Sequence, residues 1–118
     1  MMRCLFVFRY GPVGGSRAQE TFDLMLTLAA FDQKVESLLL DDGVLHLLPG
    51  QQIQDLAWCH VPALWQELEL YGIEPPLVEH ESLLERGLDR SSLLIPVRVV
   101  QRDTLPELFE NFDRLMGD

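Results

Sequence analysis

The chain has 118 residues, of which 47% are hydrophobic and 24% are charged, and these proportions exclude a disordered or low-complexity protein. Nine Lys and Arg residues against nineteen Asp and Glu residues give a net charge of −10, which repels nucleic-acid phosphates and anionic membrane surfaces, so direct binding to either is not expected. The length is that of one compact domain, which we expect to span residues 1–118.

The first element is a short apolar run that predicts a strand at Cys4–Phe8. This run is far shorter than a signal-peptide core with its cleavage site, and no apolar stretch reaches the ~18 residues of a membrane-spanning helix. Cys4 lies in the strand and Cys59 follows a tryptophan in an apolar patch, a placement that indicates neither a disulfide framework nor a zinc site. We therefore expect a cytoplasmic protein.

The next segment predicts a glycine-containing loop and then a helix. Ser16 and Gln19 have the spacing of a reciprocal helix cap. Apolar residues then recur every three or four positions, which predicts a helix that packs one face on a sheet: Phe22, Met25, Leu26, Ala29 and Ala30. The loop glycines also suit a phosphate-binding loop, but neither a Gly-x-Gly-x-x-Gly nor a P-loop sequence is present, and an ordinary turn explains them better.

A second buried strand is predicted to begin at Val35 and to end in a polar turn. Val44–Leu48 then forms one helical turn, which a Pro-Gly pair stops. Because binding groups collect at the carboxyl ends of strands in an open α/β sheet, we expect the functional region here, around Asp41, Asp42 and His46. The two aspartates are adjacent, so their side chains point apart, which disfavours a shared catalytic proton.

The second half of the chain continues the alternation of strands and helices. Gly72 ends a predicted helix, Ala63–Tyr71, that begins after a proline. Apolar spacing and turn residues predict the remaining elements: a strand at Leu77–His80, a helix at Ser82–Arg86, a strand at Leu93–Val100, a helix at Leu105–Phe112 capped by Thr104 and Glu107, and a last strand at Asp113–Met116. The repeated βα order predicts an α/β fold with a mostly parallel sheet and helices on both faces.

Candidate chemical groups are few. The histidines could bind a metal only if folding gathered them, and since no pair has the spacing of a metal motif, no metal or other cofactor is expected: His46, His60 and His80. Ser16 and Ser82 are explained as helix caps, and neither lies in a nucleophile elbow. Cys59 precedes a helix start, which makes it a better candidate for thiol chemistry than Cys4, although an inert role is the simpler interpretation.

Several sequence blocks resemble those of the sulfur-relay TusC/DsrF family. The resemblance runs nearly end to end and depends on these blocks: Phe6-Val7-Phe8 before the glycine loop, Asp42-Gly43-Val44 through Leu47-Leu48-Pro49-Gly50-Gln51, Leu70-Tyr71 with Ile73-Glu74, and Ser82-Leu83 with Glu85-Arg86-Gly87-Leu88-Asp89. It implies a single three-layer α/β/α domain of the DsrE/DsrF-like type, with a mostly parallel five-stranded sheet.

The resemblance also implies a place in a complex. Members of the family work beside TusB-type and TusD-type relatives in a heterohexamer, which passes persulfide sulfur from a small carrier protein towards 2-thiolation of the tRNA wobble uridine. The sulfur-carrying cysteine belongs chiefly to the TusD-type partner, after the strand that corresponds to Leu77–His80. Glu79 takes its place here, and a carboxylate cannot hold persulfide sulfur and repels a thiolate. The resemblance thus implies no catalytic residue and a non-catalytic subunit, not an enzyme by itself.

Large apolar and aromatic side chains dominate the cores of protein interfaces. Six of them are expected either to contact the partner subunits or to fill the core of this chain: Leu45, Leu47, Leu48, Trp58, Trp65 and Tyr71. Two alternative functions also stay open. One is a protein that itself accepts sulfur on Cys59, and the other is a subunit of a DsrEFH-type complex in dissimilatory sulfur oxidation.

Overall fold

A five-stranded parallel sheet is the centre of the fold. The computed structural model describes residues 1–12, 17–49 and 64–118, and within these ranges the strands are β1 (Arg3–Phe8), β2 (Lys34–Leu39), β3 (Leu77–Glu79), β4 (Arg98–Val100) and β5 (Arg114–Gly117). Their order across the sheet is β4-β3-β2-β1-β5, and every neighbouring pair is parallel. The predicted α/β class and parallel sheet are confirmed.

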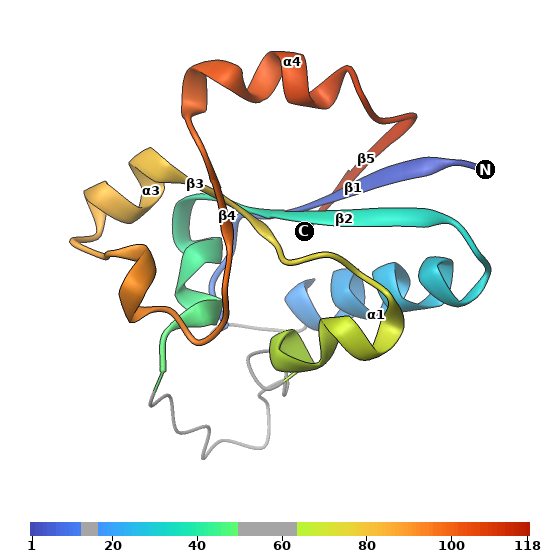
Figure 1. Cartoon of the computed structure of the whole chain (residues 1–118), viewed down its shortest axis with the longest axis horizontal. Helices are drawn as coiled ribbons and strands as arrows, with labels where there is room; N and C mark the ends of the chain where they lie inside the picture. Colours follow the sequence, from blue (N-terminus) through green and yellow to red (C-terminus); the bar gives the residue numbers. More distant parts are fainter. Residues whose placement is uncertain (13–16, 50–63) are drawn as a thin grey trace.

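Helices cover both faces of the sheet, as predicted. The described α-helices are α1 (Arg17–Ala30), α3 (His80–Glu85) and α4 (Leu105–Phe109), and the shorter 3₁₀ helices are η1 (Asp41–Leu47), η2 (Trp65–Tyr71), η3 (Arg90–Ser92) and η4 (Arg102–Thr104). Figure 1 shows α1 and η2 on one side of the sheet and α4 on the other, with α3 at the end where β2 and β3 finish. None of the described helices has both the length and the hydropathy that a membrane crossing requires.

The larger core lies between the sheet and α1. Phe22 and Met25 from the predicted stripe are fully buried and pack in one cluster with Phe6 and Phe8 of β1. Leu26 and Ala29 are partly buried at its border, whereas Ala30, at the end of the helix, is exposed. The three- and four-residue spacing therefore identified the buried face of this helix correctly, except at Ala30.

The smaller core lies under α4. Its buried members come from both sides of the contact: Leu5, Val7, Leu38, Leu40, Leu77 and Leu105. Leu108, Phe109 and Phe112 are partly buried against it, so the prediction that these residues face inward is confirmed. However, α4 ends at Phe109, and Phe112 lies in the turn that leads to β5.

The strand predicted at Leu93–Val100 is shorter than expected. Only Arg98–Val100 pairs with β3, because Pro96 has no N–H to donate to the ladder. Upstream, the Leu94 N–H donates to the carbonyl of Leu47 at 2.7 Å. This N–H is therefore bonded to η1 and not to a neighbouring strand.

Two predictions about helix ends have different outcomes. Gly72 ends η2 with φ of +71°, the left-handed conformation that glycine adopts readily, as predicted, although the described part of that helix is 3₁₀. The cap predicted for Thr104 is wrong, because its hydroxyl donates to the carbonyl of Gln101 at 2.7 Å within η4 and makes no cap hydrogen bond to α4. Ser16, predicted to cap α1, lies outside the described residues.

Candidate functional site

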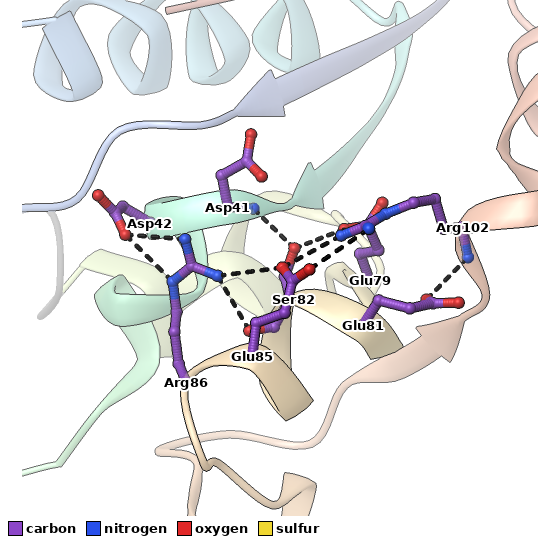
Figure 2. Close-up of polar contacts among 8 residues, drawn as sticks. All are labelled: Asp41, Asp42, Glu79, Glu81, Ser82, Glu85, Arg86 and Arg102. Carbon is purple, nitrogen blue, oxygen red and sulfur yellow. Dashed lines mark hydrogen bonds and ion pairs between the residues drawn. The ribbon is translucent and has the colours of Figure 1, made fainter.

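Polar side chains meet where β2 and β3 end. Asp41 and Asp42 open η1, one residue after the end of β2, and Glu79 is the last residue of β3. Because the two strands are parallel neighbours, their carboxyl ends lie at the same edge of the sheet. Figure 2 shows the eight residues that meet there, from η1, β3, α3 with its C-cap residue Arg86, and η4. Strand ends of this kind are the usual place for function in an open α/β sheet.

Glu79 is the buried centre of this cluster. Its side chain is only 4% exposed, and its Oε1 accepts hydrogen bonds from the Ser82 hydroxyl at 2.5 Å and from Arg102 Nη2 at 2.9 Å. The sequence prediction extended the strand to His80, but His80 is the first residue of α3. Glu79 therefore lies at the junction of a strand and a helix, with its carboxylate held from both sides.

The surroundings keep Glu79 ionised. Burial by itself raises the pKa of a carboxyl group, but the hydrogen bonds from Arg102 and Ser82, together with the positive charges of Arg102 and Arg86, outweigh this effect and lower the pKa of Glu79 below its ordinary value. The same contacts with Glu79 and Glu85 raise the pKa of Arg102. Glu79 and Arg102 thus form an ion pair at neutral pH.

Ser82 links the two strand ends. Its hydroxyl oxygen accepts a hydrogen bond from the Asp41 N–H at 2.8 Å, so the single hydroxyl proton is left to point at Glu79. Asp41 has φ of +51°, and while its N–H points towards Ser82, its carboxylate points away from the cluster (Figure 2). Ser82 was predicted to cap a helix, and this is wrong, because α3 begins two residues earlier at His80.

Arg86 forms the other half of the cluster. Its guanidinium donates to Asp42 Oδ1 from Nε at 3.1 Å and from Nη2 at 2.9 Å, and Nη1 donates to the Ser82 carbonyl at 3.1 Å. The eight residues of Figure 2 carry two arginines against five carboxylates, so this edge of the sheet is negatively charged. The buried Glu79 carboxylate contributes to this charge and opposes the approach of a thiolate to its own position.

The structure buries His46 and offers no metal site around it. Its side chain is fully buried, and its Nε2 lies 2.9 Å from the carbonyl of Tyr10. Burial lowers the pKa of His46 to about 4, which the hydrogen bond to Tyr10 only partly offsets, so the ring is neutral at pH 7 and Nε2 is the donor. Across residues 1–12, 17–49 and 64–118, no three His, Cys, Asp or Glu side chains group so that they could hold a metal ion.

The predicted contact residues separate into three groups. Trp65 and Leu47 are buried within this chain, at 1% and 0% exposure, so they belong to its core and present no side-chain surface to a partner. Leu45 and Leu48 are half-buried, and Tyr71 is 45% exposed. Trp58 lies outside the described residues.

The two cysteines also differ. Cys4 is fully buried in β1, and its pKa is raised mainly by this burial, which makes its thiol unreactive. The low reactivity expected for Cys4 thus has a structural cause. Cys59 and His60 lie outside the described residues.

Sequence reasoning did not identify Arg102 or Glu81 as members of this cluster, and Arg102 is the one that contacts Glu79. It follows β4, twenty-three residues after Glu79, in a segment where the sequence shows no motif. The signal that could have identified it is topological: β4 neighbours β3 in parallel, so a residue just after β4 lies beside the end of β3.

Comparisons with known proteins agree with this fold. Residues 2–117 match the model of the DsrE/DsrF-like family. The chain is 35% identical over 112 residues to a TusC homologue from Pseudomonas aeruginosa, with 95% of this chain and 94% of the relative covered. It is 32% identical over 117 residues to the protein TusC of Escherichia fergusonii, with 98% of each chain covered.

A solved structure supports the architecture independently. The crystal structure of the YchN protein from Escherichia coli superposes with a TM-score of 0.84 over the full length of both chains, although the sequences are only 17% identical. At this identity the likeness concerns the fold alone. The match of the family model over nearly the whole chain, together with the TusC relatives, shows that the chain belongs to the DsrE/DsrF-like family.

Proposed function

We propose that this chain is a non-catalytic subunit of a cytoplasmic sulfur-relay complex of the TusBCD type, which supports 2-thiolation of the tRNA wobble uridine. Its partners in the proposal are a TusB-like and a TusD-like protein, and a small sulfur-carrier protein acts on the complex. Support comes from the relatives named TusC, which match this chain over almost its whole length.

The observation that carries the proposal is the state of Glu79. The resemblance to the family assigns the sulfur-carrying cysteine of TusD-type proteins to this place, and here it holds an ionised carboxylate fixed by Ser82 and Arg102. A carboxylate has no sulfur to form a persulfide, and its own negative charge repels an incoming thiolate. The chemistry of sulfur transfer is therefore assigned to a partner.

The overall charge fits a protein that does not bind tRNA itself. A net charge of −10 opposes contact with a phosphate backbone, whereas it attracts a basic partner over several ångströms. Tyr71 remains a proposed contact residue, because its ring is 45% exposed beside Leu70, which is 81% exposed. Leu45, Leu48 and Trp58 are kept with it as proposed contacts.

Co-expression tests the proposal directly. The tagged chain is co-expressed with the TusB-like and TusD-like proteins of the same organism, and the purified complex is analysed by native mass spectrometry. We expect both relatives to co-purify in a fixed ratio and Tyr71→Glu to reduce their recovery. Recovery of this chain alone, under conditions where the other two remain soluble, would contradict the proposal.

The rival function, acceptance of sulfur on Cys59, is separated by a persulfide assay. The reconstituted complex receives persulfide from a sulfur donor, and transfer is compared for the unmodified chain, Cys59→Ser and Cys4→Ser. We expect equal transfer in all three, with the persulfide located on the TusD-like partner by mass spectrometry. Loss of transfer in Cys59→Ser alone would establish the rival instead.

The pathway is tested in cells. The proposal predicts that deletion of the gene lowers the 2-thiouridine content of tRNA, measured by mass spectrometry of nucleosides, and that the Cys59→Ser gene restores it. A subunit of dissimilatory sulfur oxidation, the alternative suggested by the DsrF relationship, would instead leave 2-thiouridine unchanged and impair oxidation of reduced sulfur.

A further inference from the structure

The Glu79 carboxylate is bound by hydrogen-bond donors of its own chain, in the way that a separate ligand would be. Its carboxylate is 4% exposed, yet it is ionised and receives its hydrogen bonds from two groups on other elements, Ser82 in α3 and Arg102 in η4. A buried anion with a hydroxyl donor and a guanidinium donor on one oxygen has the contacts of a bound carboxylate. The contacts of Glu79 therefore indicate which class of ligand the surrounding donors can bind.

Ser82 is oriented before any anion is present. The Asp41 N–H donates to its oxygen at 2.8 Å, and this leaves the hydroxyl proton directed at the Glu79 position. Because Ser82 is fully buried and lies within α3, we expect it to keep this position in the absence of the Glu79 carboxylate.

Arg102 is held from its backbone as well as from its side chain. Its N–H donates to Glu81 Oε1 at 2.9 Å, and Nη2 also lies 3.2 Å from Glu85 Oε1. We therefore expect the segment to stay in place when the Glu79 carboxylate is removed, with the guanidinium still able to reach the vacated position.

We propose that Ser82 and Arg102 form a binding site for a small monocarboxylate, which the Glu79 side chain occupies in the native chain and which accepts an external carboxylate when that side chain is shortened. This class of ligand is inferred from the Glu79 side chain, which has one negative charge, a planar carboxylate and a short alkyl chain. In the native chain the site is closed to other anions, including anionic sulfur groups carried by another protein. The inference depends on these contacts alone, so its failure and that of the proposed function are distinguishable.

Acetate is the natural probe. Glu79→Ala removes Cγ, Cδ and both carboxylate oxygens, and acetate has these same four heavy atoms. The variant is melted in sodium acetate and in sodium chloride of equal ionic strength. We expect the variant to melt at a lower temperature than the native chain. Acetate at ten times its dissociation constant should raise the Tm of the variant by roughly 6 °C, and chloride should lack this effect.

Three matched variants make the test specific. Glu79→Gln keeps the site filled and is expected to show no acetate effect, and Glu85→Ala removes an exposed carboxylate of the same cluster and is also expected to show none. In the double variant Glu79→Ala with Arg102→Leu, the acetate effect should disappear. Equal Tm shifts in acetate and chloride, or an acetate effect that survives the loss of Arg102, would overturn the proposal.

A second measurement applies if Glu79→Ala does not fold. The unfolded variant is then diluted from urea into sodium acetate and into sodium chloride of equal ionic strength, and recovery of the native fold is followed by far-UV circular dichroism. We expect acetate to restore the fold and chloride to have no effect, and the double variant Glu79→Ala with Arg102→Leu to stay unfolded in both salts. No recovery in acetate, or equal recovery in both salts, would overturn the proposal.

Discussion

At Gly43 the neighbouring backbone leaves no space for a side chain. A Cβ at this position would lie 1.8 Å from the Phe8 carbonyl oxygen and 2.6 Å from its carbon. The turn after β2 therefore packs directly on the end of β1, which brings Asp42 and Asp41 to the edge where β3 also ends. The Asp42-Gly43 pair in the sequence thus has a steric cause.

Gly43→Ala should destabilise the protein strongly. Because the contact is with backbone atoms, either β1 or η1 must move, and we expect a loss of about 3 kcal/mol in the free energy of unfolding, measured by urea denaturation. Gly87→Ala is the matched control: it has φ of +66° but nothing within 4 Å, so only the conformational cost of about 1 kcal/mol applies. A Gly43→Ala variant as stable as Gly87→Ala would contradict the steric account.

His46 should make stability depend on pH. Its folded pKa of about 4 lies below the ordinary 6.5, so between these values the unfolded chain binds a proton that the folded chain does not. Stability should therefore be full above pH 6.5 and fall by roughly 3 kcal/mol as the pH drops to 4. Urea denaturation of the native chain and of His46→Gln at several pH values isolates this contribution. An identical dependence of the unfolding free energy on pH in the two proteins would refute the prediction.

The sequence predicted some residues of the site and not others. Glu79 was identified because the family resemblance names its position, and the position of Asp41 and Asp42 after a strand followed from hydrophobic pattern. The role of Ser82 was predicted wrongly, since a serine before a helical run fits a cap equally well. Arg102 was missed because its partner is set by the order of strands, which local sequence does not encode.

At the scale of elements, β5 depends on its two ends. Asp113 accepts a hydrogen bond from the Arg3 N–H at 2.8 Å, and Asp118 accepts one from the Arg9 N–H at 2.9 Å. These carboxylates lie just outside the two ends of the pairing between β1 and β5. Since β5 is a short edge strand of four residues, such end contacts are a large part of what holds it.

Asp113→Ala should loosen β5 without unfolding the sheet. The Arg3 N–H loses a charged acceptor, for which we expect a cost of about 1–2 kcal/mol. Hydrogen exchange followed by mass spectrometry should show faster exchange in peptides that cover β5, with β2 unchanged. Glu110→Ala removes an exposed carboxylate from the preceding turn and serves as the control. Uniform acceleration across β1, β2 and β5 would indicate global destabilisation instead.

Elements with a strong periodic pattern were predicted well, and short ones were not. The stripe of α1 and the apolar runs of β1 and β2 give each a clear signal, and the structure has all three close to the predicted bounds. By contrast, β4 has only three residues, and its extent depends on Pro96 and on the diversion of the Leu94 N–H to η1. Such competition for backbone groups is a tertiary effect.

At the scale of the whole molecule, Cys4 should report global unfolding. It is fully buried in β1, between β2 and β5, and burial raises its pKa, so a thiol reagent should not reach it in the folded chain. In a Cys59→Ser background we expect no labelling by iodoacetamide in buffer and complete labelling in concentrated urea, measured by intact-mass spectrometry. Labelling of the folded chain at the rate of a free thiol would contradict the buried assignment.

The arrangement of β1 has a consequence for synthesis of the protein. Arg3 and Asp113 join β1 to the start of β5, and they are 110 positions apart in the sequence. During translation, β1 therefore emerges long before β5 has been synthesised. During that interval an apolar strand has an open hydrogen-bonding edge, a condition that favours binding by chaperones or by other nascent chains.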